Sequence, residues 1–234
     1  TLANAPTDLT ELGQGAIVTK QVEGKTAADT IQGIDHAEGG VVAISVNATK
    51  ADNELFVAGG MVGNIGSSIE AVSVDSVWIE VAGGTYTNIL GGVVGNNWGG
   101  GTGVATFEGD THILMREGTT DYLIGGNMND ANGVTSFTGD SYISVYEGAT
   151  VKTAVVGGST TAHGNGTKFT GSTNVFVYTC MGAGSYVVGG NFQIAGSPTT
   201  NILPGSTNVT VDLSSYSGDA TAFAGAVIGG GLTY

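Results

Sequence analysis

The chain of 234 residues is short of basic side chains. It has 6 lysines and arginines against 20 aspartates and glutamates, which gives a net charge of −14. A nucleic-acid partner needs a basic face that neutralises phosphates, and an anionic membrane attracts clustered lysine and arginine, so both are disfavoured as partners. The charge fits an extracellular acidic surface and is compatible with cation binding.

Cysteine, proline and long apolar runs are also scarce. Cys180 is the single cysteine, so no internal disulfide forms. With 11% charged and 41% hydrophobic residues, and 3 prolines beside 42 glycines, the composition is that of a folded chain with many tight turns. The longest apolar stretch near the end, AFAGAVIGGGL, falls well short of the ~20 residues that span a bilayer, so we expect no direct membrane insertion.

The chain does contain an internal repeat with two markers in phase. Gly-Gly pairs follow apolar pairs (VAGG, ILGG, LIGG, VVGG, VIGG), and their first glycines are Gly59, Gly91, Gly125, Gly157, Gly189 and Gly229. An alternating apolar strand is centred on Ile44, Ile79, Ile113, Ile143, Val175 and Val209. Steps between equivalent positions run from 30 (Ile113 to Ile143) to 40 (Gly189 to Gly229). Period-two alternation predicts strands, and a fixed repeat of short strands predicts coils that stack on one another.

We therefore predict an all-β fold, a single-stranded parallel β-helix (β-solenoid) of about six coils of roughly 32 residues, with the right-handed crossovers that strands prefer. A propeller is the main alternative, although a blade needs four strands in roughly 40 residues or more. Residues 1–35 do not follow the repeat and are expected to be a cap or lead-in segment, and residues 36–234 form the β-helix domain.

The first and last residues of the sequence each lead to an expectation about the native protein. The chain begins at Thr1 without methionine, which indicates that any targeting segment has been removed. No polar capping segment follows the last Gly-Gly pair, so we expect the native chain to continue or a second chain to cover this edge by end-to-end or edge self-association.

The pattern FxGxTxIxV…VVGG, which recurs over residues 36–234, resembles the passenger regions of bacterial autotransporters and related surface-displayed parallel β-helix repeat proteins. The resemblance implies secretion, an extracellular location on the bacterial cell surface and, often, adhesion. It carries over no catalytic residue.

Between the constant positions, the repeat varies in three outward columns. The first holds Ala43, Trp78, His112, Tyr142, Asn174 and Asn208, the second Ser45, Glu80, Leu114, Ser144, Phe176 and Thr210, and the third Asn47, Ala82, Arg116, Tyr146, Tyr178 and Asp212. Seven of these are candidate ligand-binding residues: Trp78, His112, Arg116, Tyr142, Tyr146, Phe176 and Tyr178. Aromatic rings beside polar groups are typical of surfaces that recognise a glycan or a host surface protein. Two alternatives remain open: ordinary strand propensity, and burial of this face under loops.

Matched carboxylates suggest a cofactor. Asp110 and Asp140 occupy equivalent positions in successive coils, as do Glu117 and Glu147, and stacked carboxylates repel unless a cation or hydrogen bonds intervene. Calcium is the cation that such oxygens would hold. The alternative is that GD[ST] is a turn, which the serines at the next two equivalent positions favour. No other cofactor is expected.

The sequence thus predicts an adhesin-like binding module or stalk rather than an enzyme. A glycan lyase or hydrolase is the first alternative, since Arg116 stands beside Glu117 near Asp110, and Asp110 and Asp140 are a candidate carboxylate pair. A purely structural spacer or surface-layer unit is the second.

Overall fold

The structure is a computed structural model, and it describes eleven stretches of the chain made of strands, bends and turns. These are residues 16–23, 30–32, 40–49, 56–60, 71–96, 106–130, 134–163, 166–182, 184–194, 200–218 and 225–233. All secondary-structure elements in them are β-strands.

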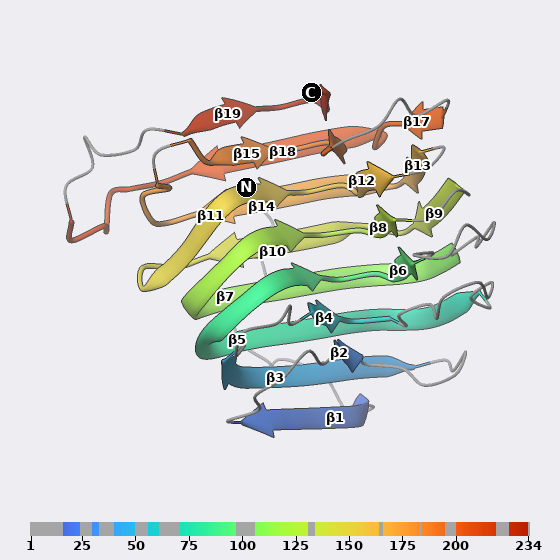
Figure 1. The fold of residues 1–234 in the computed structure, drawn as a ribbon, viewed down its shortest axis with the longest axis horizontal. Coiled ribbons are helices and arrows are strands. Elements are labelled where there is room, and N and C mark those ends of the chain that lie inside the picture. The colour runs from blue at the N-terminus through green and yellow to red at the C-terminus, as the bar shows by residue number, and fades with distance from the viewer. Residues whose placement is uncertain are drawn as a thin grey trace.

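The strands form four ladders that run along the axis of the molecule (Figure 1). The longest ladder stacks β1 (Ala16–Glu23), β3 (Val41–Thr49), β5 (Val72–Leu90), β7 (Thr106–Ile124), β10 (Ser141–Val145), β14 (Ser172–Val177) and β18 (Ser206–Val211). The second ladder follows the first within each coil. It stacks β2 (Thr30–Gln32), β4 (Phe56–Ala58), the last parts of β5 and β7, β11 (Ala149–Val156), β15 (Tyr186–Val188) and β19 (Ala226–Ile228).

Two further ladders close each coil. One is a separate sheet of β6 (Val94–Asn96), β8 (Met128–Asp130), β12 (Thr160–His163), β16 (Phe192–Gln193) and β20 (Leu232–Thr233). The other joins the first residues of β5 and β7 to β9 (Val134–Thr138), β13 (Gly166–Thr170) and β17 (Thr200–Ile202). The polar stretch of each repeat therefore contributes two strands that the sequence pattern does not reveal.

Every strand pairs in parallel with its counterpart in the next coil, and this decides between the two predicted architectures. Ile113 lies opposite Ile79 on one side and Ile143 on the other, and Ile143 lies opposite Val175. A propeller blade would instead pair strands that are neighbours along the chain. The β-solenoid is confirmed, with a coil count that differs slightly from six: the five strands of the second sheet are joined by four turns of the chain. The hand of the coil stays a prediction.

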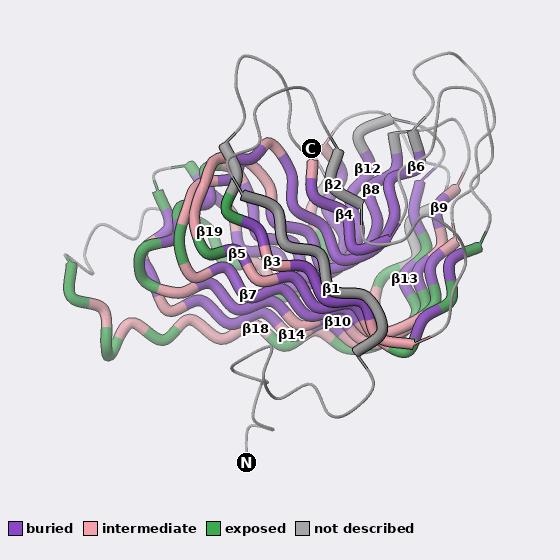
Figure 2. The backbone as a smooth tube through the Cα atoms, turned by 90° about the horizontal axis from the view of Figure 1, so that it is seen from below, coloured by how far each residue is buried: buried purple, intermediate pink, exposed green. Residues whose placement is uncertain are grey.

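The interior is built from the inward members of the alternating strands. Ile44, Ile79, Ile113, Ile143 and Val175 have no exposed surface. Burying one such side chain contributes roughly 1.5–3 kcal/mol, which explains why the alternation is kept in every coil. Figure 2, a view at right angles to Figure 1, shows buried stretches coinciding coil after coil and exposed residues gathering at the turns.

A second interior column is aromatic. Phe107, Phe137 and Phe169 stack with centroid distances of 5.1 Å and 4.4 Å, and all three side chains are buried. These rings follow the polar stretches, where the repeat is loosest in sequence, and they anchor the ladder that those stretches form.

The Gly-Gly corners are explained by space rather than by backbone conformation. A Cβ on Gly125 would lie 2.3 Å from the carbonyl oxygen of Gly157 in the next coil and 2.8 Å from Ser141. The carbonyl of Gly125 accepts a hydrogen bond from Thr111 Oγ1 at 2.6 Å, and the same bond recurs one coil on from Ser141 Oγ to Gly157. The hydroxyl residue of each GD[ST] or GST motif thus crosses the interior to the Gly-Gly pair, which couples the two sequence markers.

Part of the predicted cap carries strands of the ladder. β1 and β2 both lie within residues 1–35 and pair in parallel with β3 and β4. The remainder of that segment lies outside the described residues, so the division at residue 35 stays a prediction.

Candidate functional site

Five of the seven candidate binding residues lie on the outer face of the longest ladder, and Tyr146 and Tyr178 directly follow its strands β10 and β14. The register pairs Trp78 with His112 and His112 with Tyr142, as the first predicted column requires. The second column is also in register, since Leu114 lies opposite Ser144 and Ser144 opposite Phe176. Two of the three predicted columns are therefore confirmed along the described strands.

The third column is wrong in its first half because a β-bulge interrupts it. Val81 lies opposite Met115, but Ala82 lies opposite Glu117, so Arg116 is an extra residue on β7. From Arg116 onward the column continues: the N–H of Tyr146 bonds Met115 and that of Tyr178 bonds Val145. A bulge re-aims the side chain of the extra residue, and here it sends Arg116 towards Glu80 rather than into line with Ala82.

The first column forms a closed stack of rings, which we call the buried stack (Trp78, His112 and Tyr142). The ring centroids of Trp78 and His112 are 3.8 Å apart and those of His112 and Tyr142 are 4.7 Å apart, with planes within 10° and 5° of parallel. Trp78 is 7% exposed and His112 is 9% exposed, while Tyr142 is half-buried. The rings cover one another's faces, so two of the predicted binding residues have little surface to offer a ligand.

The imidazole of His112 is neutral in this stack. Burial lowers its pKa from 6.5 to about 4. Its Nδ1 atom is buried and has no hydrogen-bond partner in the described part of the chain. Burial, and then the carboxylates of Asp140 and Asp110, raise the pKa of the Tyr142 phenol. Both groups are uncharged at neutral pH, and the buried stack contributes packing rather than charge.

Phe176 is also buried. It is 9% exposed and lies in the second column between Ser144 and Thr210.

The third column is more open and carries charge. Tyr146 and Tyr178 stack at 5.5 Å, and the guanidinium carbon of Arg116 lies 5.1 Å from the centre of the Tyr146 ring. Arg116 Nε donates to Glu80 Oε1 at 2.5 Å. The two tyrosines and Arg116 are all half-buried. A cation–π contact and an ion pair therefore hold Arg116 beside the tyrosines.

A shallow hollow of about 370 Å³ opens beside these rings. It is lined by Tyr146, Glu147, Tyr178 and Ser215, and we call it the tyrosine hollow. Glu147 Oε1 accepts hydrogen bonds from the hydroxyl and the N–H of Ser217, which fixes the carboxylate at the rim.

The surroundings of the hollow are negative. Burial raises the pKa of the Tyr178 phenol, and neighbouring Tyr146 and the carboxylate of Asp212 raise it further. Hydrogen bonds from Ser214 lower the pKa of Asp212, so this carboxyl is ionised at neutral pH.

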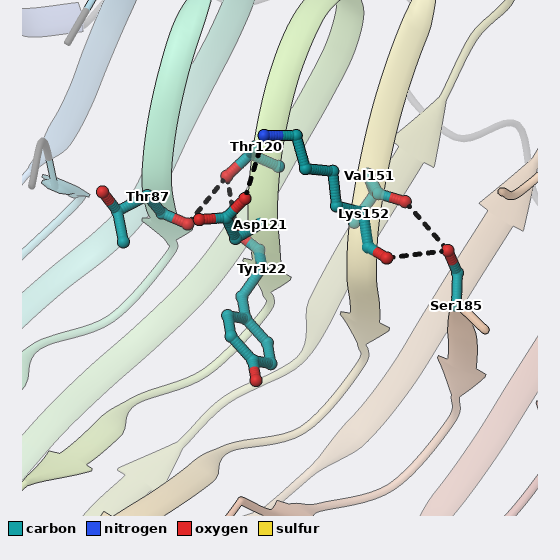
Figure 3. Close-up of polar contacts among 7 residues, drawn as sticks. All are labelled: Thr87, Thr120, Asp121, Tyr122, Val151, Lys152 and Ser185. Atoms are coloured by element: carbon teal, nitrogen blue, oxygen red, sulfur yellow. Dashed lines mark hydrogen bonds and ion pairs between the residues drawn. The ribbon is translucent and has the colours of Figure 1, made fainter. Parts of the chain in front are cut away.

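Two basic side chains of the described residues are paired with carboxylates. Arg116 pairs with Glu80, and Lys152 Nζ lies 3.4 Å from Asp121 Oδ1 on the neighbouring ladder. Figure 3 shows this second pair beside the bonds that tie successive coils together there, among them Ser185 Oγ to the carbonyls of Val151 and Lys152. These pairings leave the carboxylate at the hollow without a matching cation among its lining residues.

The matched aspartates bridge coils through the backbone. Asp110 Oδ1 accepts the N–H of Asp140 at 2.8 Å, and Asp140 Oδ1 accepts the N–H of Ser172 at 2.7 Å. These bonds provide the compensation that stacked carboxylates need. Glu117 and Glu147 are exposed. In the part of the chain that the structure describes, no three His, Cys, Asp or Glu side chains come together as a metal site, and calcium stays a prediction.

Two contributors to the site escaped the sequence analysis. Glu80 stood in the second column, two residues from Trp78, but its pairing with Arg116 depends on the bulge. Ser215 follows β18, where no repeat marker fixes its position. The first had a signal in the sequence, an acid beside a base in the neighbouring coil, and the second had none.

Comparisons with known proteins add no relative. The chain matches no protein-family model, no curated protein and no solved structure. Its likeness to autotransporter passengers thus remains a prediction from the repeat pattern. Within the described residues, no helix has the length and apolar character needed to cross a bilayer.

Proposed function

We propose that this protein is an extracellular, surface-displayed bacterial β-solenoid that acts as an adhesin-like binding module and recognises a glycan at the tyrosine hollow. One observation carries the proposal: a hollow lined by two tyrosines, a carboxylate and a serine opens just past the ends of β10, β14 and β18 in the longest ladder. Binding sites combine aromatic surface with a few fixed polar groups in this way.

The stacking of the rings defines how a ligand is recognised. Tyr146 and Tyr178 cover each other's faces, with planes 20° apart. Each of these rings therefore has one face covered, and Arg116 lies over the Tyr146 ring, so a sugar ring meets the ring edges, the phenol oxygens and the face of Tyr178 that is turned away from Tyr146. In the described part of the chain neither phenol oxygen has a hydrogen-bond partner, which leaves both available to sugar hydroxyls.

The test is an array of host and microbial glycans, mucins and matrix proteins, probed with the native chain and with a Tyr146→Ala, Tyr178→Ala double variant. Tyr186→Ala is the matched control, because Tyr186 is also half-buried and packs on an aromatic ring, Phe192, away from the hollow. We expect retention of a glycan that the double variant loses and the control keeps. Equal retention by all three chains, or none by any, would contradict the proposal, and shortened glycans would point to the enzyme alternative.

A structural stalk unit is the second candidate, and one observation favours it. Leu203 and Val227 are 47% and 48% exposed, and both lie in the coil that contains β18 and β19. A second copy stacked on this coil would cover them with the same parallel register that β14 and β18 share. Sedimentation velocity over a hundredfold range of concentration tests this, with association expected and a constant monomer contradicting it.

A further inference from the structure

We propose that the tyrosine hollow selects a cationic sugar, an amino sugar with a free ammonium group, over neutral and acidic sugars. This inference rests on the proposed function, because it names the ligand class of the same site. The charges around the hollow, a cation that the protein already holds nearby and the shape of the site support it.

The charges favour an ammonium group. The lining includes Glu147 and neither lysine nor arginine among the residues that the structure describes. Asp212 is close enough to Tyr178 to act on its phenol, and the charge of Arg116 is matched by Glu80 at 2.5 Å. With a net charge of −14 over the whole chain, an acidic sugar would be repelled both locally and at long range.

One coil away, the protein itself holds a cation between a carboxylate and an aromatic ring. The guanidinium of Arg116 is held between the carboxylate of Glu80 and the ring of Tyr146. The hollow repeats the same chemical pair, with Glu147 as carboxylate and Tyr178 as aromatic partner. A ligand ammonium would replace Arg116 as the cation in that arrangement.

The shape and the remaining groups favour a sugar over a simple amine. At about 370 Å³ the hollow is larger than an ammonium head group and lies within the ~300–1,000 Å³ range of ligand sites. The phenol oxygens of Tyr146 and Tyr178 and the side chain of Ser215 offer donors and acceptors beside Glu147, which fits a polyhydroxylated ring that also carries one charge.

The test compares four probes by titration calorimetry at pH 6, where the amino groups are protonated. They are a β-1,4-linked glucosamine tetramer, its fully N-acetylated form, the corresponding glucose tetramer and a tetralysine peptide. We expect the glucosamine tetramer to bind about tenfold or more tightly than its N-acetylated form, as a charge-assisted hydrogen bond implies. This advantage should shrink as salt is raised.

Two variants test whether Glu147 causes the preference for the charged sugar. Glu147→Gln should abolish the preference for the charged sugar, and because Glu147 is exposed the variant should fold normally, which circular dichroism checks. Glu117→Gln is the matched control: Glu117 is also exposed and is the matched glutamate one coil earlier, and its loss should leave the preference intact.

The outcomes separate the two proposals. Equal affinity for the charged and acetylated tetramers, with dependence on Tyr146 and Tyr178, would overturn the inference and leave the proposed function standing. Tetralysine binding as tightly as the glucosamine tetramer would overturn it in favour of a basic peptide. No binding of any tetramer, together with a silent glycan array, would overturn both.

Discussion

The buried stack lies on the outer face of the longest ladder, and the tyrosine hollow opens just past the ends of β10, β14 and β18 in that ladder. The two regions are built from similar side chains, yet they differ in access and charge. In the buried stack, neighbouring rings are 3.8 Å and 4.7 Å apart, and Trp78 is 7% exposed. In the hollow, the rings of Tyr146 and Tyr178 are 5.5 Å apart and half-buried, with Arg116 and Glu147 beside them. Aromatic content alone therefore does not mark a binding surface; accessible ring edges and fixed charges do.

Removing a ring from each region should give the largest difference in the free energy of unfolding. Trp78→Ala should reduce the free energy of unfolding by about 3–5 kcal/mol, the usual cost of deleting a buried large aromatic side chain. Tyr178→Ala, at a half-buried position, should cost no more than about 1–2 kcal/mol. Denaturant unfolding of both variants measures the difference, and Trp78→Phe, which keeps a ring on His112, should fall between them. Equal losses at the two sites would show that the stacks are not distinct.

Acid should weaken the buried stack selectively. The pKa of His112 is about 4 in the folded chain and 6.5 in the unfolded chain, so between these values the unfolded chain binds a proton that the folded chain does not. Its contribution is therefore fully present above pH 6.5 and declines as the pH falls towards 4, by up to about 3 kcal/mol. Unfolding curves of the native chain and of His112→Phe across this range isolate the effect, because the carboxylates titrate in both. Parallel stability profiles would contradict the burial of a neutral imidazole.

The smallest effect concerns the ion pair that borders the hollow. A double-mutant cycle with Glu80→Gln and Arg116→Gln should give a coupling energy of about 0.2–1 kcal/mol that decreases with salt, since both side chains are partly exposed. A coupling well above this range would mean that the pair is a structural anchor, as tightly built as the buried stack.

The sequence predicts the repeated strands and their register well because the repeat is periodic. The alternation around Ile113 and Ile143 identified strand, face and register, and each of these follows from period-two geometry. It did not predict the bulge at Arg116, since an extra residue leaves the alternation readable on either side.

The sequence also does not predict how deeply the side chains of the outer face are buried. Alternation places His112 and Arg116 outside the interior but does not reveal how closely their neighbours cover them. The sequence identifies the Gly-Gly pairs but not their cause, because the close approach of Gly125 to Gly157 is a contact between coils. For Asp110 and Asp140 the sequence predicts a turn or a calcium site, of which calcium stays a prediction, and it does not reveal that each carboxylate bonds the backbone of the next coil.

The most direct test of recognition at the tyrosine hollow is a titration of aromatic side-chain NMR signals with the glucosamine tetramer and its N-acetylated form. The ring signals of Tyr146 and Tyr178 should shift as ligand is added, while those of Trp78 and His112 stay in place. Shifts centred on the buried stack, or no shift at any ring with either tetramer, would contradict the assignment of the binding site.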